Sequence, residues 1–218
     1  MKPLILINFK TYLEATGKKA VLLAQKIAAV QSKKYQLAIA PPTLELEHVC
    51  KAVNIKVFAQ HLDSDDYGAH TGEITAKDVK KLGATGTLLN HSERKLAFPI
   101  LQKTVQECQK DKLQVIICAS SLQEIKKMVR LKPTYIAYEP AALIGGEKSV
   151  TSSKPEIIKQ AVQLVSRMSP DTKVLCGAGV HSREDILAAI QLGAAGVLIG
   201  HAVPKAKDPK KFLEKMTQ

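Results

Sequence analysis

The chain has 218 residues, of which 45% are hydrophobic and 24% charged, and its formal net charge is +12. This length suits one large domain or two small ones, and the composition is that of an ordinary globular protein. No apolar run approaches the roughly 20 residues that a membrane-spanning helix needs, and the first apolar run is too short for the core of a signal peptide. We therefore expect a cytoplasmic protein without a membrane partner.

The positive charge is compatible with a nucleic acid, an anionic surface or an anionic small substrate. Its lysines are spread along the chain, tryptophan is absent and aromatic residues make up only 4%. A face that stacks bases would combine clustered basic residues with aromatic rings. We expect no nucleic-acid partner, and we expect the charge to help gather phosphorylated substrates.

Two groups of residues in the sequence are of types that bind metals. The cysteines show no C-x-x-C pair and no zinc-ligand spacing, so we expect them to be reduced: Cys50, Cys108, Cys118 and Cys176. A second group resembles a metal cluster, but its spacing fits no metal motif: His61, Asp63, Asp65, Asp66 and His70. We expect neither a metal nor a cofactor.

Taken in chain order, short apolar runs rich in β-branched residues predict eight strands. They lie near Leu4–Asn8, Gln36–Ala40, Lys56–Gln60, Gly86–Asn90, Gln114–Cys118, Thr134–Tyr138, Lys173–Cys176 and Gly196–Ile199. Helical periodicity lies between the strands, most clearly over Lys18–Val30 and Lys154–Met168. Capping-box patterns occur at Ser153 with Glu156 and at Ser182 with Asp185.

Eight strands alternating with helices predict an α/β protein, a (β/α)8 barrel with a parallel eight-stranded sheet, as one catalytic domain over residues 1–218. The competing fold is a doubly wound open sheet, which usually has fewer strands. An internal echo favours the barrel: Leu82-Gly83-Ala84 precedes the fourth strand and Leu192-Gly193-Ala194 precedes the eighth. In each copy a glycine can end a helix in the left-handed conformation, although this linker is also common elsewhere.

The most informative segment runs from Tyr135 to Gly146. An apolar run ends in Glu139, Pro140 follows at once, and Gly145 and Gly146 lie a few residues on. A buried strand that delivers a carboxylate to its mouth, under a hinged loop, suits proton abstraction in a site that can close. The alternative is a strand-terminal glutamate before an ordinary turn.

Barrel enzymes carry their chemistry at the carboxyl ends of the strands. Polar or glycine-rich segments follow the first, fourth, seventh and eighth predicted strands: Asn8-Phe9-Lys10, Asn90-His91-Ser92-Glu93-Arg94, Cys176-Gly177-Ala178-Gly179 and Gly200-His201. Each has a simpler structural interpretation, such as a solvated lysine, a capping histidine or a plain turn. Glu93 is expected to pair with Lys10 or Arg94.

In this order and spacing, these segments resemble the triosephosphate isomerase family, in its short archaeal form, over essentially all 218 residues. Supporting motifs are Ala59-Gln60, Gly68–Ile74, Ala137–Pro140 and Gly196–Gly200. The resemblance implies an isomerase of glycolysis and gluconeogenesis that interconverts dihydroxyacetone phosphate and glyceraldehyde 3-phosphate through an enediolate.

The resemblance also implies residue roles. Glu139 is the base, His91 polarises the carbonyl, Lys10 supplies positive charge and Asn8 orients the site, with Ser92 and Glu93 in support. Backbone N–H groups of Gly145, Gly179, Gly200 and His201 are expected to bind the phosphate, with the His201 amide mattering more than its ring. We also expect Ser92–Lys95 to be helix-like and its dipole to keep His91 neutral.

The chain differs from the better-known members of this family at two places, and the resemblance also implies an oligomer. The turn after the seventh strand, Cys176–Gly179, lacks the Tyr and Ser hydroxyls that often help to hold the loop closed, and Ala141–Leu143 lacks the usual aromatic residue. Segment Asp65–Glu73 resembles a family loop that reaches into a neighbouring subunit, so we expect a homodimer or homotetramer. The Asp65–Glu73 segment is also long for a loop of a barrel, and such long loops usually serve binding.

Two other functions stay open at this stage. Another phosphosugar barrel, such as an epimerase, would share the phosphate loops but would not explain Asn8, Lys10, His91 and Glu139 together. A basic nucleic-acid-binding protein would be expected to gather its lysines and arginines on one face.

Overall fold

The computed structural model describes residues 2–140, 155–177 and 179–218. Its strands pair in parallel in chain order, and the last pairs with the first to close a barrel. They are β1 (Leu4–Asn8), β2 (Gln36–Ala40), β3 (Lys56–Ala59), β4 (Gly86–Leu89), β5 (Gln114–Ala119), β6 (Tyr135–Tyr138), β7 (Lys173–Cys176) and β8 (Gly196–Ile199). The predicted (β/α)8 barrel is confirmed, and each predicted strand is correct to within one residue at either end.

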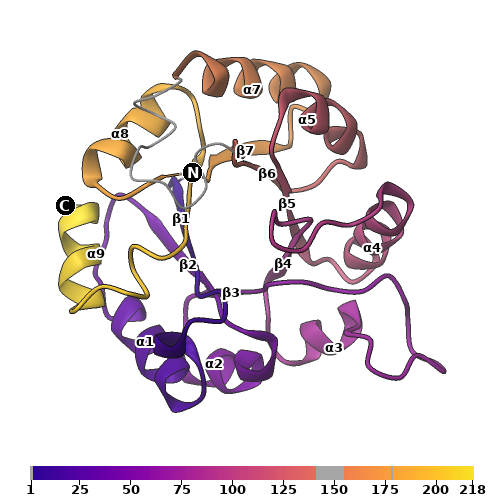
Figure 1. Cartoon of the computed structure of the whole chain (residues 1–218), viewed down its shortest axis with the longest axis horizontal. Coiled ribbons are helices and arrows are strands. Elements are labelled where there is room, and N and C mark those ends of the chain that lie inside the picture. The colour runs from indigo at the N-terminus through magenta and orange to yellow at the C-terminus, as the bar shows by residue number, and fades with distance from the viewer. Residues whose placement is uncertain (1, 141–154, 178) are drawn as a thin grey trace.

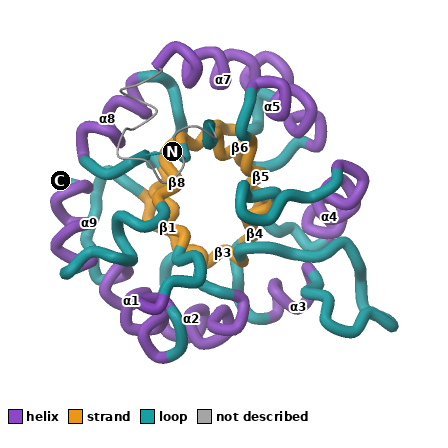
Figure 2. The backbone as a smooth tube through the Cα atoms, viewed as in Figure 1, coloured by secondary structure: helices purple, strands orange, loops and turns teal. Residues whose placement is uncertain are grey.

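Helices surround this ring of strands (Figures 1 and 2). They are α1 (Lys18–Ala28), α2 (Leu46–Ala52), α3 (Ala76–Lys81), α4 (Phe98–Lys110), α5 (Leu122–Met128), α7 (Pro155–Met168), α8 (Arg183–Gln191) and α9 (Pro209–Thr217). Short 3-10 turns lie at Leu13–Ala15, Thr43–Glu45 and Val129–Leu131. Within the described ranges, no helix is both long enough and apolar enough to cross a membrane.

Local signals explain where several helices begin and end. The capping box at Ser182 and Asp185 is confirmed, with both reciprocal hydrogen bonds present. The first predicted helix ends two residues earlier than expected, and Lys154 and Ser153 lie outside the described residues. Gly83 and Gly193 follow α3 and α8 with φ of 95° and 93°, so the predicted echo is confirmed in the backbone.

The strands bury side chains on both faces, in two separate layers. Outward-facing residues such as Ile5 and Ile7 pack under the helices. Inward-facing residues fill the barrel as one cluster: Leu4, Leu6, Ala38, Ala40, Phe58, Leu88, Ile116, Cys118, Tyr135, Ala137, Leu175 and Leu198. Because successive side chains alternate between the faces, these inward positions also determine which residues reach the barrel mouth.

One glycine is required for the barrel to close. Gly196 begins β8 with φ of 148°, and a Cβ there would lie 1.9 Å from the carbonyl oxygen of Leu4 on β1. No heavy atoms approach so closely, so only glycine allows β8 to pair with β1 in this register.

We therefore expect Gly196→Ala to lower the free energy of unfolding by about 3 kcal/mol or more, through backbone strain and overpacking together. The measurement is urea denaturation followed by circular dichroism. Gly83→Ala is the matched control, because its Cβ would meet only Cys50 at an ordinary 3.7 Å. It should cost about 1–2 kcal/mol from strain alone, and equal losses in the two variants would contradict the role of the close approach.

Candidate active site

The inward alternation of the strands converges on one cavity at their carboxyl ends. In β1, Leu4 and Leu6 face inward and Asn8 is the next position; in β6, Tyr135 and Ala137 lead in the same way to Glu139. The cavity is lined by Asn8, Lys10, Tyr12, His91, Glu139, Gly177, Gly179, Val180, His181, Leu198, Gly200, His201 and Ala202. The strand pattern thus brings together most residues that the sequence assigned to the site.

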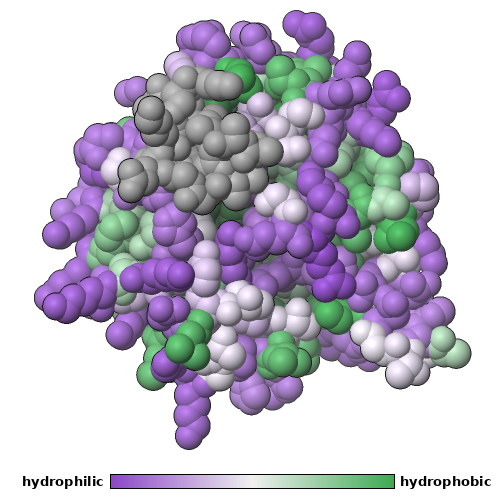
Figure 3. Space-filling view, in the orientation of Figure 1, coloured by the Kyte–Doolittle hydropathy of each residue, from purple (hydrophilic) through white to green (hydrophobic). Residues whose placement is uncertain are grey.

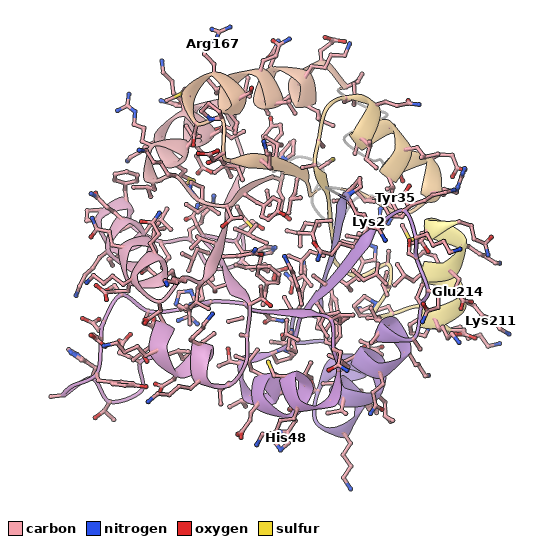
Figure 4. All side chains as sticks on the ribbon, turned by 180° about the vertical axis from the view of Figure 1, so that it is seen from behind. Lys2, Tyr35, His48, Arg167, Lys211 and Glu214 are labelled. Atoms are coloured by element: carbon pink, nitrogen blue, oxygen red, sulfur yellow. The ribbon has the colours of Figure 1, made fainter. Side chains whose placement is uncertain are left out.

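A hollow lies near the centre of the face shown in Figure 3, and its visible rim is mostly hydrophilic. Figure 4 views the molecule from behind and labels Lys2 and Tyr35, which precede β1 and β2. These labels place the amino ends of the strands on the rear face, so Figures 1 to 3 look onto their carboxyl ends.

Lys10 is held in an uncommon backbone conformation. Its φ is 49°, in the left-handed region that costs a non-glycine residue about 1–2 kcal/mol. The Asn8 side chain accepts a hydrogen bond from the Lys10 amide at 2.9 Å, and the Gln60 amide donates to the Lys10 carbonyl at 3.0 Å. Two side chains therefore fix the turn that aims Lys10 into the cavity.

The expected pairing of Glu93 with Lys10 is confirmed. The Lys10 ammonium lies 2.6 Å from Oε1 of Glu93. Burial lowers the pKa of Lys10, but the hydrogen bond and charge of Glu93, with smaller effects of Tyr12 and Glu139, leave that pKa raised overall. Lys10 is thus a permanent cation at the edge of the cavity.

His91 is oriented by the backbone that follows it. Its ring is buried, and its Nδ1 accepts a hydrogen bond from the amide of Glu93 at 3.2 Å. A neutral imidazole that accepts at Nδ1 carries its proton on Nε2. That nitrogen lies 3.7 Å from Oε1 of Glu139, so the donor side of His91 is turned toward the carboxylate.

The pKa of His91 is lowered, but the expected helix dipole is not the cause. Residues 92–94 form a turn without helix, and the next helix, α4, begins only at Phe98. Burial lowers the pKa most; the charge of Glu93 raises it, and the positive charges of Lys10 and Lys95 lower it further. The prediction of a helix-like segment over Ser92–Lys95 was wrong, since the N-cap of the next helix is Ala97.

Glu139 is a carboxylic acid in a nearly dry environment. Only 5% of the residue is exposed, and its amide donates to the Ala119 carbonyl, which extends the pairing of β5 and β6. Burial raises its pKa from 4.5 to about 7, while a hydrogen bond from the Cys118 thiol and the charge of Lys10 act in the opposite direction. A carboxylate in this state is poised to exchange a proton near neutral pH.

Two buried side-chain oxygens in the described residues have no hydrogen-bond partner, and both belong to predicted site residues. They are Oγ of Ser92 and Oε2 of Glu139. Buried polar atoms are normally satisfied, and Glu139 lines the cavity, so its unpaired oxygen is a position where a ligand can bind.

Glycines let the chain approach Glu139 and Lys10 closely. A Cβ at Gly177 would lie 2.5 Å from Cγ of Glu139, and one at Gly200 would lie 3.3 Å from Cε of Lys10. Gly179 has φ of 66°. The sequence suggested Gly179 and Gly200 as anion sites but did not show that Gly177 makes room for the carboxylate, because that contact is between different strands.

Two histidines lie side by side in the same cavity. His201 was predicted there for its backbone amide. His181, which the sequence analysis did not single out, stands with its ring centroid 5.1 Å from that of His201. The sequence could have identified His181 as a site residue from its position shortly after β7.

Gly145, Gly146 and the loop residues from 141 to 150 lie outside the described residues, as does Ala178. The expected phosphate contact at Gly145 and the expected lid therefore stay predictions. Within the described residues, no group of three or more His, Cys, Asp or Glu side chains is arranged to hold a metal ion.

The comparisons with known proteins agree with this geometry. Residues 3–217 match the triosephosphate isomerase family. The chain is 40% identical to the triosephosphate isomerase of Methanothermus fervidus over 99% of this chain and 97% of that protein. The enzymes of the same name from Methanosarcina mazei and Methanocaldococcus jannaschii are 39% and 38% identical, over 97% and 98% of this chain and 96% and 98% of theirs. A match of this extent means that the chain belongs to the triosephosphate isomerase family.

Proposed function

We propose that this protein interconverts dihydroxyacetone phosphate and glyceraldehyde 3-phosphate, with Glu139, His91 and Lys10 as its catalytic residues. The observation that carries these roles is the convergence of a buried carboxylate, a neutral imidazole and a lysine on one cavity. The carboxylate and the imidazole stand 3.7 Å apart. The reaction moves protons and no net electrons, so it needs no cofactor.

The first step is the removal of a proton from the carbon next to the substrate carbonyl. The Glu139 carboxylate takes this proton, the electron pair of the C–H bond forms a C=C bond, and the π pair of the carbonyl moves onto its oxygen to give an enediolate. Because Glu139 is buried, its charge is weakly solvated and it is a stronger base than an exposed carboxylate. The same carboxyl group later returns the proton to the neighbouring carbon.

The enediolate needs hydrogen-bond donors and positive charge that are in place before it forms. The Nε2 proton of His91 faces the cavity side that Glu139 occupies, and Lys10 adds a positive charge that its ion pair with Glu93 helps to keep protonated. A neutral imidazole is matched in acidity to an enediol, so it can pass a proton between the two oxygens. Asn8 holds the Lys10 turn, and Ser92, which follows His91 in the chain, has a buried hydroxyl without a hydrogen-bond partner.

We assign the phosphate group to the turns after β7 and β8. Backbone N–H groups of Gly179, Gly200 and His201 supply the donors, since tight turns present several amides to one anion. Gly145 completes the set in this proposal. In this proposal residues 1–218 act as one catalytic domain in the cytoplasm, where thiols such as those of Cys50, Cys108 and Cys118 stay reduced.

The proposed activity is tested by a coupled assay that supplies glyceraldehyde 3-phosphate and follows dihydroxyacetone phosphate. In that assay, Glu139→Gln should lower turnover by roughly a hundredfold or more, the scale of a positioned base. The Michaelis constant should change little, because Gln keeps the shape of the side chain. Near-normal turnover of the purified variant would remove Glu139 from the mechanism.

A stability measurement serves as the control for this variant. The raised pKa means that the folded state disfavours the carboxylate, so stability falls as pH rises from the ordinary value of 4.5 through about 7. Gln carries no charge, and Glu139→Gln should therefore have a Tm at least as high as the parent protein at about pH 8. A lower Tm would indicate that lost activity reflects unfolding.

We also propose that the protein is at least a homodimer, with a tetramer as the larger alternative. The segment between β3 and α3 extends away from the barrel (Figures 1 and 2), and residues 66–73 within it are exposed. A second cavity of about 350 Å³ borders the site and is lined by Asn8, Lys10, Thr11, Pro42, Thr43, Leu44, Gln60, His61, His91, Glu93 and Arg94. A partner's protruding segment in this cavity would cover Leu44, which is 89% exposed, and would support Lys10 and His91.

Thr71→Arg, in the exposed part of this segment, should weaken association and lower activity together, because in this proposal the added side chain and charge must be buried in the second cavity. Light scattering across a dilution series gives the assembly, and the isomerase assay is run at the same concentrations. Gln163→Arg on the exposed face of α7 adds the same charge and should change neither quantity. A fully active monomeric Thr71→Arg protein would refute the proposal.

A further inference from the structure

The turns after β7 and β8 carry two imidazoles that the proposed mechanism does not use. His181 and His201 line the same cavity as Glu139, and their rings stand 5.1 Å apart at an angle of 54°. Both residues are partly buried. Two rings at this separation can contact one tetrahedral anion between or beside them.

The charged groups that act on His201 are basic. They are His181, Lys10 and Lys205. The amide of Lys205 donates to the His201 carbonyl at 3.0 Å, and the Lys205 ammonium lies 4.4 Å from the centre of the Tyr12 ring. From the α8 side, Asp185 accepts hydrogen bonds from the amides of His181 and Ser182. The Asp185 carboxylate is thus already hydrogen-bonded to backbone amides. The three basic groups around His201 therefore make this end of the cavity favourable for an anion.

We infer that the rings of His181 and His201 form a second contact for the substrate phosphate group, one that becomes tighter when His201 is protonated. This inference rests on the proposed function, since it uses the phosphate position assigned above. It adds a specificity contact of a different kind, because backbone amides bind an anion equally at every pH whereas an imidazole binds it more tightly once it is protonated.

The electrostatics give the direction of the pH dependence. Burial lowers the pKa of His201 below 6.5, and repulsion from His181, Lys10 and Lys205 lowers it further. In the free protein the ring is therefore mostly neutral at pH 7. A bound dianion cancels the repulsion and raises this pKa, so binding takes up protons and becomes tighter as the pH falls.

Binding of sulfate, measured by calorimetry at constant ionic strength between about pH 8 and pH 6, tests this inference. Sulfate remains a dianion over this range, so any change in affinity comes from the protein. We expect its affinity to rise about three- to tenfold toward pH 6, within the tenfold per pH unit that one linked proton allows. Repeating the titration at about pH 7 in buffers of different ionisation enthalpy gives the number of protons taken up per bound sulfate.

The variants are His181→Asn, His201→Asn and the double substitution. At about pH 8, where His201 is neutral, each should bind sulfate within about twofold of the parent protein. At about pH 6 the double variant should lose most of the gain in affinity and of the proton uptake. Glu139 and His91 titrate in all of these proteins, so the difference between parent and variants isolates the pair.

His48→Asn provides the matched control. His48 lies exposed on α2, and Figure 4 places it on the outer side of the barrel, away from the mouth. This variant should keep the parent's pH dependence. An unchanged pH slope in the double variant, an equal loss at both pH values, or no binding of sulfate to the parent protein would each overturn the inference.

Because calorimetry needs no turnover, the two proposals fail separately. A protein that isomerises triose phosphates but shows the same sulfate profile with and without the two rings keeps its proposed function and loses this inference. A protein without isomerase activity loses the proposed function whatever its sulfate profile.

Discussion

A carboxylate buried at the mouth of an apolar barrel is the constraint on which the site depends. The interior cluster ends in Ala137 on β6, and the next inward position is Glu139, with the Cys118 thiol beside it. Gly177 leaves the space that the carboxyl group fills. Water is largely excluded there, so the charge is destabilised and the pKa rises to about 7. The raised pKa of Glu139 and its proposed role as a base thus have one physical cause, the exclusion of water from the carboxylate.

The surrounding protein accommodates this carboxylate at some expense to its own stability. Lys10 and Asn90 both have left-handed φ values, 49° and 58°, that non-glycine residues rarely adopt. Side-chain hydrogen bonds hold each of them: Asn8 to the Lys10 amide, and Asn90 to the carbonyl of Cys118. The strained turns place a cation and an imidazole around the carboxylate, and unstrained turns would point Lys10 and His91 elsewhere. The rigid strands supply the support that makes these conformations persist.

Periodicity and strand-end chemistry predicted the barrel, its strand boundaries and the residues at its mouth, because both depend on near neighbours in the chain. The effect of Gly177 on Glu139 and the pairing of His181 with His201 were not predictable in this way, since each joins residues of different strands or turns. The cause of the lowered His91 pKa was misjudged for a similar reason. Burial and the charges of Lys10 and Lys95 lower this pKa. Neither the burial of His91 nor its distance from these two charges can be read from the local sequence.

The central claim is that burial makes Glu139 a base with a pKa near neutrality, and carbon-13 NMR of side-chain carboxyl groups measures this most directly. Protein labelled at the glutamate carboxyl carbon would be titrated from about pH 4 to pH 9, with Glu139→Gln used to assign the resonance. We expect the Glu139 signal to titrate near pH 7 in the free protein. A signal that titrates at the ordinary value of 4.5 would contradict the account, because the carboxylate would then be solvated and the buried-base mechanism would lose its physical basis.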